Sequence, residues 1–95
     1  MEKLVTIVQQ FPLTERNYTD RSGQAQVFAS KGFVLSDGID TFYAEMVGDT
    51  ARAHRDMHFD ESVSHAVQTQ ISTREYTDRD NQKRYSNDVR ILKMV

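Results

Sequence analysis

The chain has 95 residues, a formal net charge of −2 and 38% hydrophobic residues, which indicates one globular domain over residues 1–95. It contains no cysteine, so disulfide frameworks, thiol catalysis and cysteine metal sites are excluded. No apolar run has the length of a membrane span and no signal-peptide profile opens the chain, so we expect a cytoplasmic protein without membrane contact.

The first half of the chain shows the period-two alternation of β-strands. Residues 3–11 form the first predicted strand, and Pro12 ends it because proline has no N–H to donate to a ladder. A hairpin follows, with a return strand from Gln24 to Leu35 in which Gly32 predicts a bulge or a tight bend. A third strand is predicted over residues 41–48. Its two faces carry Phe42, Ala44 and Met46, and Tyr43, Glu45 and Val47.

Residues 49–61 break the alternation and predict a short helix. Asp49 or Thr50 is the predicted cap, and Ala53 and Met57 stand four apart, as a helical stripe requires. The alternation returns at Val63 in a fourth strand, and residues 84–95 form the fifth. The phenylalanines are assigned to the core, with one or two at the surface as the alternative. They are Phe11, Phe28, Phe33, Phe42 and Phe59.

Two stretches of the chain share one pattern. Residues 16–24 and 74–82 match at six positions with a constant offset of 58. In each, an aspartate opens a turn and a Gly or Asn follows three residues later, which is typical of a type I turn closed by a left-handed residue. The sequence therefore predicts two similar hairpins, each presenting Arg, Tyr and Arg near its tip.

This order of elements predicts an all-β fold. It fits the five-stranded barrel of the oligonucleotide/oligosaccharide-binding (OB) fold, with a short helix between strands 3 and 4. A small β-sandwich is the competing architecture.

Residues 70–90 resemble the last hairpin of bacterial single-stranded DNA-binding proteins, through Arg74, Tyr76, Thr77-Asp78, the turn, Gln82 and Arg84-Tyr85. Residues 41–48 resemble that family's third strand, where a base-stacking aromatic precedes an apolar run ending in Gly. The resemblance implies an OB fold, binding of single-stranded DNA and assembly as a dimer or tetramer. The chain departs from the family by carrying Tyr43 and Tyr76 in place of tryptophan, and by lacking the acidic C-terminal tail.

Single-strand binding requires cations for phosphates and aromatic faces for bases, and the two hairpins offer both. Arg16 and Tyr18 are two residues apart and so share a strand face, as do Arg74 and Tyr76. Acidic neighbours leave residues 74–84 with four positive and three negative charges, a net of +1. The predicted nucleic-acid-binding residues are Arg16, Tyr18, Arg21, Tyr43, Arg74, Tyr76, Arg79, Lys83, Arg84 and Tyr85.

Alternatives stay open for these residues. The tyrosines can serve as cross-strand pairs, and the cations as a solvated face. An OB-like protein-interaction module, an accessory subunit with a protein partner and no nucleic acid, suits the negative net charge. His54 and His58 share a helical face, but Arg55 stands where a metalloprotease motif needs glutamate. We therefore predict no metal site, no cofactor and no enzymatic activity.

Overall fold

A computed structural model of the protein describes residues 2–95, which are mostly β-strand. The elements in chain order are β1 (Glu2–Gln10), β2 (Thr14–Thr19), β3 (Ala25–Ser36), β4 (Thr41–Val47), α1 (Gly48–Ala53), β5 (His65–Thr77) and β6 (Lys83–Met94). The predicted strands are confirmed to within a residue or two at most ends. Pro12 does lie in the break that separates β1 from β2. No helix in the described part of the chain is long and apolar enough to cross a membrane.

Five of the strands close into a ring. Around it, β1 pairs with β5, β5 with β6, β6 with β4, β4 with β3, and β3 with β1. All of these pairings are antiparallel except β4–β6, which is parallel and has the single register pair Glu45 and Arg90. All six strands belong to one sheet, so the two packed sheets of a sandwich are not formed.

The core fills the inside of the ring. Alternate residues of each strand point inward, and the largest fully buried side chains are Phe33, Leu35, Met46, Ile91 and Val5. The predicted faces of β4 are confirmed, because Ala44 and Met46 are fully buried while Tyr43 is exposed. Of the phenylalanines assigned to the core, Phe33 and Phe59 are buried, whereas Phe28 is 36% exposed. The core assignment of Phe28 is therefore wrong.

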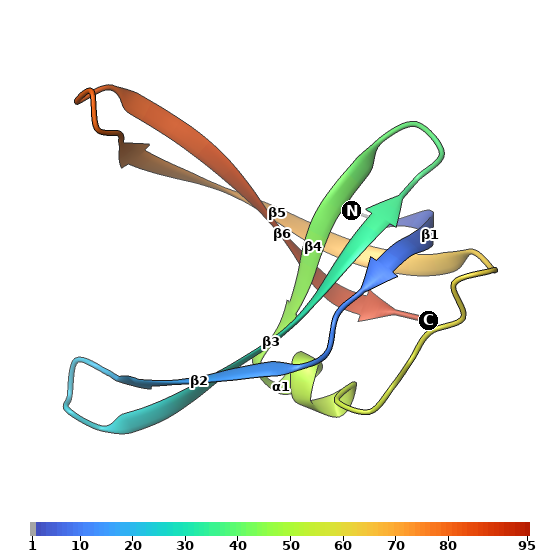
Figure 1. The fold of residues 1–95 in the computed structure, drawn as a ribbon, viewed down its shortest axis with the longest axis horizontal. Helices are drawn as coiled ribbons and strands as arrows, with labels where there is room; N and C mark the ends of the chain where they lie inside the picture. Colours follow the sequence, from blue (N-terminus) through green and yellow to red (C-terminus); the bar gives the residue numbers. More distant parts are fainter. Residues whose placement is uncertain (1) are drawn as a thin grey trace.

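The two hairpins extend beyond the ring, β2–β3 toward the lower left and β5–β6 toward the upper left (Figure 1). Their turns are built alike. Gly23 N–H donates to Asp20 O at 3.1 Å, and Asn81 N–H donates to Asp78 O at 3.1 Å. Gly23 and Asn81 have φ of 85° and 62°, so the predicted left-handed closing residue is confirmed in both.

Gly32 lies where β3 changes partners. Before it, β3 pairs with β2, and after it β3 pairs with β1. The register with β4 runs through Gly32 without interruption, so the predicted bulge is absent there. The Phe11 N–H donates to Gly32 O at 3.0 Å and anchors the break between β1 and β2 against this point.

The predicted short helix between the third and fourth predicted strands is confirmed, but the predicted stripe of Ala53 and Met57 does not form. The helix ends at Ala53, and its N-cap is Val47, which makes no side-chain capping bond, instead of Asp49 or Thr50. The buried Lys31 ammonium donates to His54 O at 2.8 Å and also to Met57 O. These carbonyls lie just past the helix end, so a tertiary contact fixes the segment as a loop and leaves Met57 47% exposed.

Candidate nucleic-acid interface

The outward face of β4 carries a tyrosine that lies flat against the sheet. Tyr43 is 52% exposed, and its ring lies over Gly32 of β3. A β-carbon built on Gly32 would be only 2.3 Å from the Tyr43 hydroxyl oxygen. On its other side Phe11 packs at 6.3 Å between ring centroids, tilted by 58°. The absence of a side chain at residue 32 therefore allows this aromatic surface to lie on the sheet.

Glu45 lies two residues further along the same face of β4. Partial burial raises the pKa of Tyr43, and the charge of Glu45 and a hydrogen bond with its carboxylate raise it further. Glu45 forms no ion pair within residues 2–95, although Arg90 is its register partner on β6.

A hollow of about 420 Å³ opens beside Tyr43, between β4 and the base of the β5–β6 hairpin. It is lined by Phe42, Tyr43, Glu45, Ile71, Asn87, Asp88 and Val89. The lining combines an aromatic ring and apolar side chains with an amide and two carboxylates. It is thus suited to a flat ligand that has polar edges.

A second hollow of about 460 Å³ lies at the base of the β2–β3 hairpin, lined by Thr14, Glu15, Arg16, Phe28, Ser30 and Glu45. The Arg16 guanidinium is 5.5 Å from the centroid of the Phe28 ring, a cation–π arrangement. Because Glu45 lines both hollows, they adjoin on the outward face of β3 and β4. We call the two hollows together the groove.

The first hairpin turns its predicted pair toward this groove. Arg16 is the register partner of Phe28, and Tyr18 is the partner of Gln26. Since directly paired residues and residues two apart share a face, Arg16, Tyr18 and Phe28 lie on one side of the hairpin. Tyr18 is 48% exposed there, and Arg21 stands in the turn.

The second hairpin divides its predicted residues between two faces. Tyr85 pairs with Glu75 and Lys83 pairs with Thr77, on the face that continues into Ile71 and Asn87 of the groove. The opposite face holds Tyr76, Arg84 and Arg74, with Tyr76 paired to Arg84. The structure therefore brings Tyr85 and Lys83 onto the groove side and leaves the other three on the outer side.

Some of the predicted cations are neutralised locally. Arg84 Nε is 2.8 Å from Asp78 Oδ2, and Lys83 Nζ is 3.6 Å from Glu75 Oε1. The hydrogen bond from Arg84, then that from the Gln82 N–H, lowers the pKa of Asp78. Among the predicted binding residues, the arginines that make no ion pair with acids of the described chain are Arg16, Arg21, Arg74 and Arg79.

Sequence analysis missed Phe28 and Glu45 as groove residues. The signal for Phe28 was present, because alternation puts it on the same face as the polar Gln26 and Ser30. Glu45 had no such signal, since only the approach of β2 and of the β5–β6 hairpin to β4 makes it central.

The histidines of the loop after α1 hold that loop in place. His54 Nδ1 lies 2.8 Å from Thr50 O, and its ring stacks on Phe59 at 5.9 Å. His58 Nε2 lies 3.3 Å from the Gln10 amide nitrogen. Among residues 2–95, no three His, Cys, Asp or Glu side chains are grouped so as to hold a metal ion.

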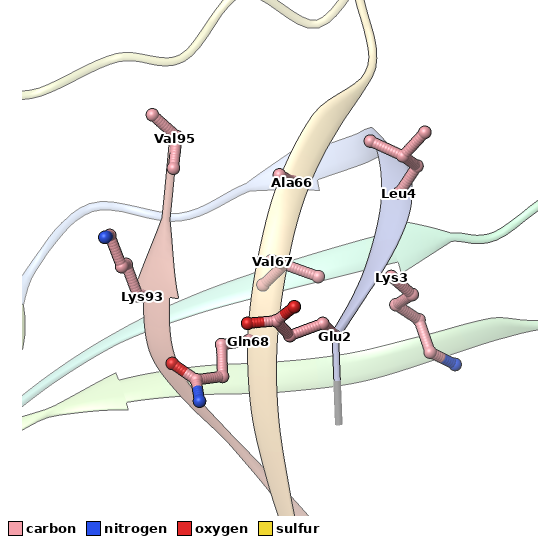
Figure 2. A pocket seen from close by; sticks show the side chains of 8 residues that line it. All are labelled: Glu2, Lys3, Leu4, Ala66, Val67, Gln68, Lys93 and Val95. Carbon is pink, nitrogen blue, oxygen red and sulfur yellow. The ribbon is translucent and has the colours of Figure 1, made fainter.

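A further hollow lies away from the groove, on the outer surface of β1, β5 and the end of β6 (Figure 2). It has a volume of about 400 Å³ and an apolar centre formed by Leu4, Ala66 and Val95. Leu4 and Val95 are 67% and 72% exposed. Glu2, Lys3 and Lys93 stand at its rim, so both signs of charge surround the apolar surface.

Comparison with known proteins adds no family assignment, because no protein-family model and no curated protein matches the sequence.

Proposed function

We propose that the chain is an OB-fold domain that binds single-stranded DNA with little dependence on sequence. The pairing order of the ring supports the fold, since an OB barrel also joins five strands in a Greek-key ring around one core. OB folds bind oligonucleotides on the face of their second and third strands, between the loops that join strands 1–2 and 4–5. In this chain those strands are β3 and β4, and those connections are the two hairpins.

The observation that carries the proposal is the groove itself. It puts the exposed Tyr43 ring and the Arg16–Phe28 pair on one outward face, between hairpins that carry arginines without acidic partners. Bases stack on the aromatic rings, each contact stabilising binding by about 1–3 kcal/mol. Phosphates are bound by the arginines without acidic partners on the hairpins. Binding weakens as salt rises, because the release of counterions from the phosphates then contributes less free energy.

The proposal includes self-association into a dimer or tetramer. The apolar surface around Leu4 and Val95 is exposed in the single chain, and Glu2 and Lys93 beside it supply both signs of charge, which an interface between two identical copies can pair. Several barrels joined in this way bind one strand more tightly than a single barrel does, through effective concentration.

A second candidate is favoured by the charge of the groove. Glu15, Glu45 and Asp88 line it against the single cation Arg16, and Glu15 is paired with Arg55. A groove lined by carboxylates and aromatic rings is suited to binding a basic segment of a partner protein. In that case the domain is an interaction module and nucleic acid is not its ligand.

A salt titration of binding to fluorescent oligo-dT distinguishes the two. We expect measurable binding at low salt that weakens as salt rises, and a loss of affinity in Tyr43→Ala that exceeds the loss in Tyr43→Phe, which keeps the ring. Absence of binding at tens of micromolar protein in low salt would exclude the nucleic-acid proposal and favour the interaction module.

A further inference from the structure

Glu45 has an unusual place for a carboxylate in a surface that binds a polyanion. It is half-buried at the junction of the two hollows, two residues from Tyr43 on the same strand face. A phosphate next to this group would be repelled. A strand that crosses the groove must therefore present something other than its backbone at this point.

The surroundings of Glu45 leave room for a base. Glu45 lines both hollows of the groove, of about 460 and 420 Å³, and the Tyr43 ring beside it lies over Gly32, the register partner of Glu45 on β3. Side chains two apart on one strand face are separated by roughly 7 Å. A base stacked beside Tyr43 thus brings its edge, and not its face, toward the carboxylate.

We propose that Glu45 is a specificity-determining residue that selects guanine at one position of the bound strand. This inference rests on the proposed single-strand binding and adds one base-selective subsite to an otherwise unselective groove. An ionised carboxylate only accepts hydrogen bonds, and its two oxygens offer about four lone-pair sites.

Guanine matches this acceptor best among the four bases. Its Watson–Crick edge carries two adjacent donors, N1–H and the N2 amino group, which can bind both carboxylate oxygens. Thymine presents one N–H between two carbonyl oxygens, which the carboxylate repels. Adenine and cytosine present one amino group beside a bare acceptor nitrogen. A good bidentate contact to a base discriminates by roughly 5- to 150-fold in affinity.

The test compares a short dT oligonucleotide with the same oligonucleotide carrying one central dG, dA, dC or inosine. A single guanine avoids the self-association of guanine runs, and inosine removes only the N2 amino group. For the wild-type protein we expect the dG oligonucleotide to bind at least fivefold more tightly than dT, with inosine in between. In Glu45→Gln, the ratio of dG to dT affinity should fall close to one.

Asp88→Asn is the matched control, because it removes a carboxylate from the same hollow and should preserve the dG-to-dT ratio. Using the ratio cancels the general gain in affinity that follows from losing a negative charge. Equal binding of dT and dG by the wild type, or a preference that persists in Glu45→Gln, overturns the guanine subsite and leaves single-strand binding intact. Failure of every oligonucleotide to bind overturns the proposed function instead.

Discussion

The hydroxyl of Tyr43 occupies the space beside Gly32 that a β-carbon would need, at 2.3 Å from its ideal position. Two further ring atoms of Tyr43 would lie at 2.9 Å from it. Such distances are too short for any side chain, so the tyrosine ring and a residue larger than glycine cannot coexist in this arrangement.

We therefore expect Gly32→Ala to displace the Tyr43 ring and to lower the free energy of unfolding by about 1–3 kcal/mol, as overpacking does. Urea unfolding measures the change. In a Tyr43→Ala background the same substitution should cost much less, because the clashing ring is gone. Equal costs in the two backgrounds would show that residue 32 is constrained by something other than Tyr43.

The faces of the second hairpin predict different roles for its two tyrosines. Tyr85 lies on the groove side and Tyr76 on the opposite side. Tyr85→Ala should weaken oligo-dT binding by about 1–3 kcal/mol, whereas Tyr76→Ala should cost about 0.2–1 kcal/mol of stability from lost cross-strand pairing and little affinity. Fluorescence anisotropy and thermal melting measure these effects. A greater loss of affinity in Tyr76→Ala would place the binding surface on the outer side of the hairpin.

The turn aspartates predict a loss of stability in acid. The Ser22 hydroxyl, the Gln24 N–H and the Gln26 amide hold the pKa of Asp20 at about 2, below its ordinary value of 3.8. A carboxyl whose pKa is lower in the folded state stabilises the fold above its unfolded pKa, and this stabilisation is lost as the pH falls from 3.8 toward 2.

Asp20→Asn keeps the oxygen that accepts the Ser22 and Gln24 N–H bonds but removes the titration. Its melting temperature should therefore fall less than that of the wild type over the same acidification. Asp37, whose pKa is also about 2 because of the Asp40 and Ile39 N–H groups and Lys3, provides an independent second site for the same comparison. Parallel melting curves for wild type and Asp20→Asn across this range would contradict the assignment.

A further prediction concerns Lys31, which lies on the face of β3 opposite to the groove. Burial lowers the pKa of Lys31, with Asp56 acting against this, and its ammonium holds two carbonyls of the loop after α1. Lys31→Met keeps an unbranched stem of four atoms but removes the ammonium that binds these two carbonyls, at a cost of about 1–3 kcal/mol. Hydrogen exchange should report loosening of residues 54–60. Unchanged stability in this variant would mean that water replaces the ammonium.

Local chemistry explains which parts of the fold could be predicted from sequence. The hairpin turns depend on an aspartate and a left-handed residue within one short segment, so Asp20 with Gly23 and Asp78 with Asn81 were recognised correctly. The faces of β4 follow from alternation alone.

The parts that could not be predicted depend on contacts between distant segments. The helix after Val47 stops early because Lys31, more than twenty residues upstream, binds the carbonyls that would have continued it. The groove arises where β2, β4 and the β5–β6 hairpin meet, so the central position of Glu45 depends on strands that are distant in the sequence. Phe28 is the exception, because its place on the same strand face as polar residues indicates from the sequence alone that it is exposed.

The ring closes between β4 and β6 through the single register pair of Glu45 and Arg90. Every other junction of the ring is a longer antiparallel ladder, so this junction, which we call the seam, is the shortest of the ring. The seam lies directly beneath the groove, and a ligand seated there spans both strands. If single-stranded DNA binds there, amide protons along β4 and β6 should exchange more slowly. Hydrogen exchange at the shortest junction of the ring would then report ligand binding.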